Sequence, residues 1–269
     1  MTPERAQAPG VIWPAPRFIE IRFCLLRRRF EAILNTDTLE ILMKTIRAYI
    51  DSKQQEFRNH PFFDVLEQMG SLKEIGCIVP GLTFWVMAFQ DVLRLNEERV
   101  TDPDLKKIAR HHRLEDAGHE QWFLHDRNYM CGMDSNSADL NALFGKDARW
   151  ARDPAYAIMA EVFKSDSDWL NIVLLLVIES SGHVFFEKIV KQVQAIGEDR
   201  NLKYFSSSHF KVELAHALFD DEMERKLYAE PLPENIREDA LRLVDRCYGA
   251  FDQMFDGLML ACDSQGVTQ

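Results

Sequence analysis

The sequence predicts an all-α fold, and three observations lead to that prediction. Apolar residues recur at helical spacing along most of the chain, and no alternating strand pattern of useful length appears. Helix breakers are few, with 12 Gly and 10 Pro among 269 residues. Because no Pro/Gly/Ser linker divides the chain, we expect a single helical domain over residues 16–269, preceded by a flexible arm at residues 1–15. The domain should be a bundle of about seven to eight helices.

The predicted helices succeed one another with short breaks. We expect them over residues 16–34, 37–58, 61–69, 73–97, 102–130, 154–197, 200–228 and 233–262. A break near "KSDSDW" should interrupt the helix over 154–197. The tripeptides "TDP" at 101–103 and "DPA" at 153–155 are typical of helix starts, because proline is tolerated in the first turn.

Charge and hydropathy exclude several classes of partner. The net charge is −11, so the chain as a whole should be repelled by phosphate backbones and anionic lipid, and we expect no nucleic-acid partner. The most apolar run, "WLNIVLLLVI" at 169–178, is too short for a membrane span because the polar residues Glu179 and His183 come directly after it. It predicts a buried helix and no membrane insertion.

Cysteine usage predicts a reduced protein in the cytoplasm. The five cysteines are widely separated and form no CxxC pair, so neither a disulfide framework nor a thiolate zinc site is expected. They are Cys24, Cys77, Cys131, Cys247 and Cys262. The N-terminus has no unbroken apolar stretch behind a basic start, so we do not expect a signal peptide.

A first polar stripe lies in "HHRLEDAGHEQWFLHD" at 111–126. On one continuous α-helix, residues three and four apart share a face, so His112, Glu115, Asp116 and His119 would form one stripe. Such a stripe is costly to bury unless something charged lies against it. The spacing leaves both acids open as the partner of His119, and we prefer Glu115.

Two further stripes lie on helices that should be buried. In "LLLVIESSGHVFFEKIV" at 174–190, Glu179 comes directly after an apolar run and therefore needs a partner inside the bundle. In "SSSHFKVELAHALFDDE" at 206–222, His209, Glu213 and His216 occur at i, i+4 and i+7, which is one helix face. Each stripe alone also has a plain structural explanation, as a solvated face or a buried ion pair.

Together the stripes supply three carboxylates and three imidazoles. This mixture suits iron or manganese better than it suits metals that prefer thiolates, and helical bundles build dinuclear sites from inward-facing Glu and His residues. Six ligands are too many for one catalytic metal with open positions and about right for two. The predicted ligands are Glu115, His119, Glu179, His209, Glu213 and His216.

These residues resemble those of the haem-oxygenase-like diiron oxidases and oxygenases. "HFKVELAH" at 209–216 is similar to that family's His-x3-Asp/Glu-x2-His helix, and Glu179 lies where the family has an isolated ligand carboxylate. "EDAGH" at 115–119 resembles the first ligand helix, and "HPFFDVLEQMG" at 60–70 resembles an early helix of the fold. The resemblance spans about residues 60–230 and implies a haem-oxygenase-like helical bundle with two iron ions per chain.

Four more residues have supporting or alternative roles under this resemblance. Asp116 is the substitute for Glu115, and Asp91 is a weak candidate for a further carboxylate from the preceding helix. We favour His183 as a hydrogen-bond partner of a ligand carboxylate, with a seventh ligand and a core histidine as the alternatives. Asp220 should orient His216 by accepting its second ring N–H.

The resemblance implies reductive activation of O2 by two ferrous ions, followed by oxidation of a small metabolite, in a biosynthetic pathway. Substrates of this class are amine-, amino-acid- or fatty-acid-like, and the reactions are N-oxygenation, C–C cleavage or desaturation. An external electron donor is left open as a partner. The segment "FWVMAF" at 84–89, with Trp122 and Phe123, is a candidate lining for an apolar pocket over the metals, although core packing explains it equally.

Two other functions stay open at this point. The same fold carries a metal-independent TenA-like hydrolase with a cysteine nucleophile, for which only Cys77 and Cys131 lie near the relevant helices. A non-catalytic iron-binding helical protein is the other. We also expect a homodimer, because the amphipathic segment "RFIEIRFCLLRRRFEAIL" at 17–34 carries more apolar residues than a surface helix needs.

Overall fold

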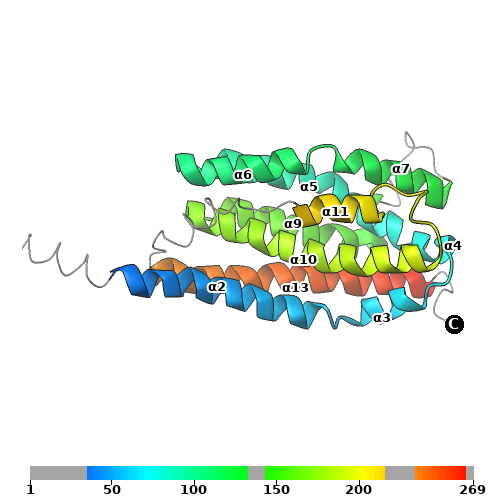
Figure 1. Cartoon of the computed structure of the whole chain (residues 1–269), viewed down its shortest axis with the longest axis horizontal. Helices are drawn as coiled ribbons and strands as arrows, with labels where there is room; N and C mark the ends of the chain where they lie inside the picture. The colour runs from blue at the N-terminus through cyan, green and yellow to red at the C-terminus, as the bar shows by residue number, and fades with distance from the viewer. Residues whose placement is uncertain (1–34, 133–142, 216–233, 265–269) are drawn as a thin grey trace, which may run out of the picture.

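The computed structural model describes residues 35–132, 143–215 and 234–264, and every regular element in these ranges is a helix (Figure 1). The all-α prediction is therefore confirmed. The predicted arm at 1–15 and the predicted helix at 16–34 lie outside the described residues. The elements are α2 (Asn35–Phe57), α3 (Pro61–Gln68), α4 (Leu72–Ile75), η1 (Gly76–Ile78), α5 (Val79–Arg99), α6 (Pro103–Glu115), α7 (His119–Cys131), η2 (Lys146–Ala148), α9 (Arg149–Lys164), α10 (Asp168–Ala195), α11 (Ser207–Ala215) and α13 (Glu234–Ser264).

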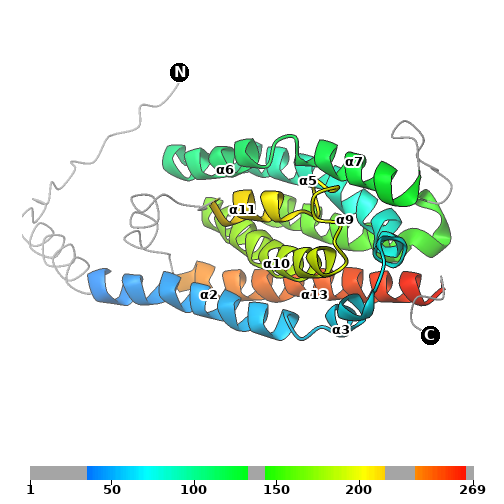
Figure 2. The same cartoon turned by 45° about the vertical axis from the view of Figure 1, so that its right-hand side comes forward.

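The long helices run roughly along one direction and form layers (Figures 1 and 2). Helices α6 and α7 lie end to end along one side, whereas α2, α3 and α13 lie along the opposite side. Helix α10 lies between these layers and packs against α2, α6, α11 and α13, while α5 packs against α6, α7 and α9. Helix α6 thus packs against both α5 and α10, so a polar side chain on its inward side can reach α10.

Local capping explains where several helices begin. The Asp102 carboxylate accepts hydrogen bonds from the backbone N–H groups of Asp104 and Leu105, each at 2.9 Å, and Pro103 occupies the first turn of α6. The predicted start at "TDP" is confirmed. His60 caps α3 by accepting from the Phe62 N–H at 3.2 Å, and Pro61 again comes directly after the cap.

The predicted helix over 102–130 is wrong as a single element. Helix α6 ends at Glu115 and α7 begins at His119, because Gly118 adopts a φ of 95° that a continuing right-handed helix does not allow. The Gln90 side-chain amide donates to the backbone C=O of Asp116 at 3.0 Å, which satisfies a carbonyl freed by the break. Residues 115–119 therefore do not lie along one helical face.

The predicted helix start at "DPA" is also wrong. Helix α9 begins at Arg149, directly after η2, so Pro154 lies inside it. The additional turn holds Trp150 against two glycines, because a Cβ atom on Gly81 would approach the indole within 2.4 Å and one on Gly257 within 2.1 Å. Close packing of α5, α9 and α13 around this indole accounts for the earlier start. The predicted break near "KSDSDW" is confirmed, since α9 ends at Lys164 and α10 begins at Asp168.

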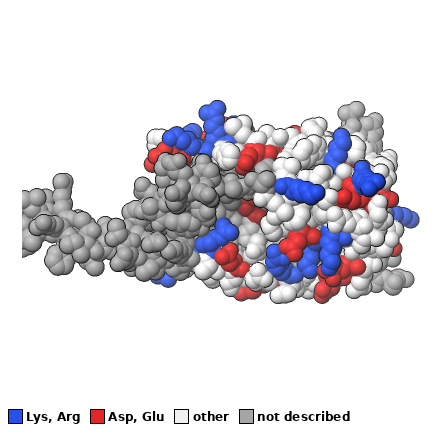
Figure 3. All heavy atoms as spheres, viewed as in Figure 1, with Lys and Arg blue, Asp and Glu red and all other residues white. Residues whose placement is uncertain are grey.

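The core is apolar and rich in aromatic residues. Phe255 on α13 contacts the rings of Phe57, Phe62 and Phe63, with centroid distances of 4.9, 5.1 and 5.4 Å. Two stretches, Leu72–Arg99 and Asp168–Ala195, are long and apolar enough to cross a membrane by length and composition. In the most apolar 18-residue part of each stretch, 56% and 67% of the residues are buried inside the bundle. A buried core helix has the same length and composition. Lys and Arg are interspersed with Asp and Glu over the face drawn in Figure 3.

A disulfide joins two distant segments, and the expectation that all the cysteines are reduced is wrong for this pair. Cys77 in η1 and Cys262 near the end of α13 are bonded, with their Cα atoms 5.3 Å apart. A sequence separation of 185 residues gives no local signal of this contact. Cys131 and Cys247 are free. The bond ties the start of α5 to the last turns of α13.

We predict that Cys262→Ser destabilises the protein by roughly 2–4 kcal/mol, because the disulfide restricts the unfolded chain over a long loop. Urea unfolding with and without reductant measures this. Reductant should lower the stability of the wild type and leave Cys262→Ser unchanged, while Cys131→Ser should respond to reductant as the wild type does. A wild type whose midpoint ignores reductant would contradict the bond.

Candidate metal centre

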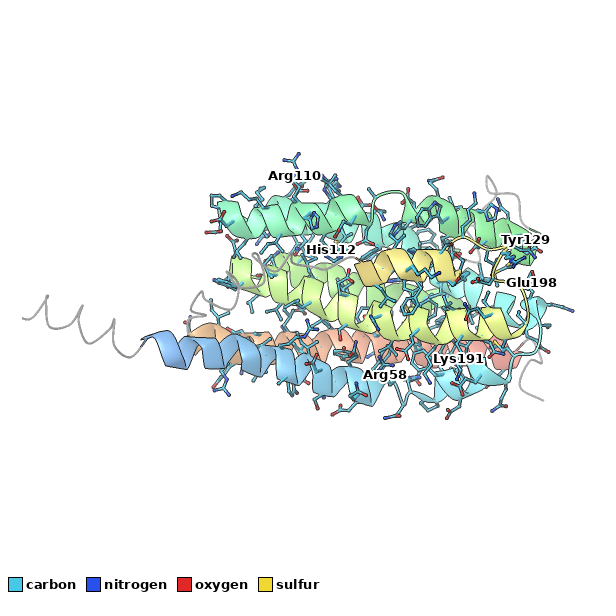
Figure 4. The ribbon with its side chains drawn as sticks, viewed as in Figure 1. Arg58, Arg110, His112, Tyr129, Lys191 and Glu198 are labelled. Carbon is cyan, nitrogen blue, oxygen red and sulfur yellow. A yellow bond between two sulfur atoms is a disulfide. The ribbon has the colours of Figure 1, made fainter. Side chains whose placement is uncertain are left out.

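The break between α6 and α7 places two polar side chains inside the bundle. Asp116 is the C-cap of α6 and is 4% exposed, and His119 is the first residue of α7 and is 7% exposed. His112, one turn before Asp116, is 2% exposed. Figure 4 shows Arg110 pointing outward from α6, which agrees with its exposure, whereas His112 is buried in the bundle.

The first polar group consists of His112, Asp116 and Glu179. His112 Nε2 lies 2.6 Å from Glu179 Oε1 on α10 and 2.9 Å from Asp116 Oδ2. One candidate ligand atom from each of the three residues lies within 4.8 Å of the others. Glu179 follows the apolar run of α10 and needs a partner inside the bundle. Its partner is a histidine from α6.

The second group consists of His119, His209 and Glu213. His209 Nε2 lies 2.6 Å from Glu213 Oε1, and His119 Nδ1 lies 3.2 Å from the same oxygen. The two imidazoles are in direct contact, with His209 Nε2 and His119 Nδ1 3.2 Å apart. Helix α11 supplies two members of this group and α7 supplies the third.

Asp116 connects the two groups. Its Oδ2 faces His112 at 2.9 Å and its Oδ1 faces His119 at 3.2 Å, so each oxygen of one carboxylate points to a different group. Although His112 Nε2 and Asp116 Oδ2 are close, neither of these buried atoms makes a hydrogen bond, and His112 Nδ1 is also buried without one. Buried polar atoms that converge without hydrogen bonding to one another are a costly arrangement, and a cation between them would satisfy them.

The electrostatics of the groups favour positive charge. Burial opposes the charged form of His112, but the neighbouring Glu179 and Asp116 outweigh it and raise the pKa of His112 to about 10. Burial likewise opposes the charged form of His119, yet Asp116 and Glu213 raise its pKa to about 9. Protons on these two rings neutralise carboxylates that would otherwise be uncompensated.

The carboxylates of the first group differ in their response to burial. Burial raises the pKa of Glu179, and the nearby His112 only partly offsets this effect. Burial also acts to raise the pKa of Asp116, but its contacts with His112 and His119 prevail and lower it. The carboxylate that touches both groups is thus the one most strongly held in its charged form.

The donor set fits metal ions of intermediate hardness. Three imidazoles and three carboxylates converge from four helices, which are the ligand types that iron, manganese and zinc accept, whereas no thiolate takes part. Helical bundles place dinuclear sites in this way, with side chains projecting inward from facing helices. The ligand atoms of the two groups are His112, Asp116 and Glu179 for one, and His119, His209 and Glu213 for the other.

The structure brings together four of the six predicted ligands: His119, Glu179, His209 and Glu213. It places Glu115 outside both groups, where its Oε1 lies 3.1 Å from Nε2 of the exposed His111. The preference for Glu115 over Asp116 fails because it assumed one continuous helix through Gly118. The predicted ligand His216 and its predicted partner Asp220 lie outside the described residues.

The two remaining alternatives lie away from the groups. Asp91 is largely exposed and pairs with Arg94 at 3.0 Å. His183 is half-buried on α10, one turn beyond Glu179, with its Nε2 3.9 Å from Glu187 Oε2. It does not join either group, but it lines the cavity beside them.

Sequence reasoning left His112 out of the ligand set, although it recognised this residue in the first stripe. The signal that would have selected it is its i, i+4 spacing to Asp116, with Ile108 and Ala109 buried on the preceding turn. The prediction treated His112 and His119 as parts of one helix and paired only His119 with an acid. In the structure His112 belongs to α6 and His119 to α7, so each has its own contact with Asp116.

A cavity opens beside the two groups. Its volume available to the centres of water-sized molecules is about 90 Å³, room for several waters. Asp116, Glu179, His119, His209 and Glu213 form its polar end. Its walls are mainly apolar and come from α5, α10 and α13, including Leu82, Trp85, Val86, Phe89, Ile178, Phe185, Phe186, Phe251, Met254 and Phe255.

The predicted aromatic lining is therefore met only in part. Trp85 and Phe89 line the cavity, whereas Phe84 packs against Phe144 and Tyr156 outside it. Trp122 stacks on the ring of His119, with centroids 4.6 Å apart. Phe123 is fully buried against Tyr204 and Phe205 in the core.

Neither cysteine considered as a nucleophile is suited to that role. Cys77 is bonded to Cys262, and Cys131 is absent from the described residues that line the cavity. Burial raises the pKa of the Cys131 thiol, which lowers its thiolate fraction. The hydrolase hypothesis thus finds no cysteine among the described residues that line the cavity.

Comparison with known proteins finds no matching family model and no matching curated protein. Among solved structures, the chain is similar to a domain of unknown function with a heme oxygenase-like fold from Shewanella denitrificans OS217. The TM-score is 0.56 and the sequence identity is 17%, and the match covers 84% of this chain and 93% of that chain. The chain has a heme oxygenase-like fold. At 17% identity this similarity shows the fold alone, so the function has to be argued from the site.

We predict that Asp116→Asn lowers metal binding to about one ion per chain or fewer, because the amide removes the charge that lies between the two groups. Glu115→Gln should bind metal as the wild type does, since Glu115 belongs to neither group and pairs with His111. Anaerobic equilibrium dialysis with Fe(II), followed by metal analysis, compares the variants. Equal loss in both variants would contradict the placement of these residues.

We also predict that the metal-free protein loses stability as the pH rises. The folded pKa values of His112 and His119, about 10 and about 9, lie above the unfolded value of about 6.5. Their contribution is therefore fully present below about pH 6.5 and disappears as the pH rises through about 9 to 10. Urea unfolding of chelator-treated protein at about pH 7 and about pH 9.5 tests this. His112→Gln should lose less stability over that range, and a flat wild-type profile would refute the ion pairs.

Proposed function

We propose that this protein is a non-haem, dinuclear iron oxidase or oxygenase that uses O2 to oxidise a small, mainly apolar metabolite. The observation that carries the proposal is the pair of largely buried His/carboxylate groups, joined by Asp116, beside a cavity whose walls are mainly apolar. Buried polar clusters at the end of an apolar pocket are typical of catalytic sites.

Each residue has a role in this proposal. His112 and Glu179 would hold one metal ion, His119, His209 and Glu213 would hold the other, and Asp116 would contact both. Ferrous ions bound there would supply the electrons that reduce O2. Gln90, by holding the Asp116 carbonyl at the helix break, keeps the shared carboxylate in place.

The walls of the cavity support an apolar substrate. Aromatic side chains from α5, α10 and α13 would contact the substrate and keep water away from it. None of the described lining residues is Lys or Arg, so the histidines are the cationic side chains that the described part of the cavity can offer to a substrate. Burial lowers the pKa of His183 and keeps its ring neutral near pH 7, so it can donate or accept a hydrogen bond to a polar substrate group.

Metal and O2 measurements test the proposal together. Anaerobically reconstituted protein should bind about two Fe(II) per chain, and Mössbauer spectra after O2 exposure should show a coupled diferric pair. His112→Ala should bind about one fewer ion, because among the described residues its ring is the single imidazole of the first group.

Two outcomes would overturn the proposal. Clean 1:1 zinc binding without iron uptake would exclude a dinuclear iron site. Uptake of iron well beyond about two per chain, with O2 consumed only in proportion to added Fe(II), would instead indicate a non-catalytic iron-binding protein.

A further inference from the structure

The segment between α10 and α11 is anchored to α7 by a buried carboxylate. Asp126 is 0% exposed, and its Oδ1 accepts a hydrogen bond from the Lys203 N–H at 2.8 Å. Its Oδ2 accepts from the Phe205 N–H at 3.0 Å. One turn further along α7, the Tyr129 hydroxyl donates to Glu198 at 3.3 Å, and Figure 4 shows this pair at the same end of the bundle. Two contacts from α7 thus hold this segment.

Tyr204, between the two anchored residues, determines the orientation of His209. The Tyr204 carbonyl lies 2.6 Å from His209 Nδ1. A carbonyl oxygen only accepts hydrogen bonds, so Nδ1 must carry the proton of this bond. The lone pair of the neutral ring is then on Nε2, the atom that lies 2.6 Å from Glu213 and belongs to the second group.

The His209 ring has little freedom to turn away from this arrangement. It is 2% exposed and contacts the rings of Phe186, Tyr204 and Trp122 at centroid distances of 4.7, 4.9 and 5.1 Å. These contacts restrict the ring but carry no preference for one nitrogen over the other. That preference comes from the Tyr204 carbonyl. Asp126 accepts from the Phe205 N–H, which belongs to the same peptide unit as this carbonyl, and from the Lys203 N–H earlier in the segment.

We propose that Asp126 is a positioning residue for the metal centre, acting through the Tyr204 carbonyl to keep His209 protonated on Nδ1 and its Nε2 available to the metal. This inference rests on the proposed function, in which His209 is a ligand. Hydrogen bonds to the far nitrogen of a ligand histidine typically change metal affinity about 10- to 100-fold when they are lost. Asp126 does not itself touch the metal groups, so its effect should pass through the segment.

Asp126→Asn is the most direct test. The amide oxygen can accept only from one of the two N–H groups, and its NH2 would face the other donor, so the segment should loosen. We expect anaerobic Co(II) titration, followed by visible absorption, to show affinity at the second site weakened about 10-fold or more. Asp126→Glu, which retains both acceptor oxygens, should bind Co(II) more tightly than Asp126→Asn.

A matched control separates positioning from general stability. Asp168 also accepts two backbone N–H bonds across a helix connection, both on Oδ2, from Thr101 at 3.0 Å and from Asp102 at 2.6 Å, and an amide in its place weakens both by removing the charge. It lies at the start of α10 and contributes nothing to either metal group. Asp168→Asn should therefore destabilise the fold while leaving Co(II) affinity and the cobalt spectrum unchanged.

A second readout uses the metal-free protein. Ring ¹⁵N NMR of chelator-treated wild type should show His209 Nδ1 protonated and that proton protected from solvent exchange. Asp126→Asn should lose the protection, and amide exchange at Lys203 and Phe205 should accelerate with it. Asp168→Asn should change neither signal.

The outcomes are distinguishable. Wild-type Co(II) affinity in Asp126→Asn, or equal weakening in Asp126→Asn and Asp168→Asn, would overturn the positioning role. An unprotected Nδ1 in the wild type would overturn it as well. A wild type that binds neither Co(II) nor Fe(II) would refute the proposed function and the metal role of Asp126 with it, while the NMR readout would still show whether Asp126 controls the His209 ring.

Discussion

The site depends on one buried carboxylate at a break between two helices. Asp116 is 4% exposed, and its two oxygens face imidazoles from α6 and α7. A carboxylate at such a depth has to be compensated by positive charge, and all the polar side chains around it come from helices that otherwise bury apolar residues. The break at Gly118 makes the arrangement possible, because it lets α6 and α7 present His112 and His119 to the same carboxylate from opposite sides.

The fold was largely predictable because helices are local. Spacing of apolar residues, the cap at Asp102 and the polar interruption before α10 all act over a few residues, and each is visible in the sequence. The misplaced boundaries have causes that the helical spacing of apolar residues does not reveal. One glycine splits the helix over 102–130, and packing of Trp150 extends α9 beyond the proline that resembled its start. The disulfide between Cys77 and Cys262 joins distant parts of the described bundle and has no local signal.

The candidate site was predictable only within single helices. His209 and Glu213 lie one turn apart on α11, and their pairing can be read from helical periodicity. Which acid meets His119, and that His112 faces Glu179, depend on how α6, α7 and α10 pack together. The contacts of Asp126 and of the Tyr204 carbonyl could not be predicted from the sequence, because every residue has a backbone carbonyl and its partner depends on the fold.

The indole of Trp150 has a consequence for the shape of the cavity. It is seated between Gly81 on α5 and Gly257 on α13. Gly81 is next to Leu82 and Gly257 is two residues beyond Phe255, and both of these neighbours line the cavity. Trp150 is not among the residues that line the cavity, so its packing against the two glycines positions these walls from behind. A change of residue at either glycine would alter the width of the chamber while leaving its lining intact. The shape of the cavity can thus change through positions that a comparison of pocket residues would overlook.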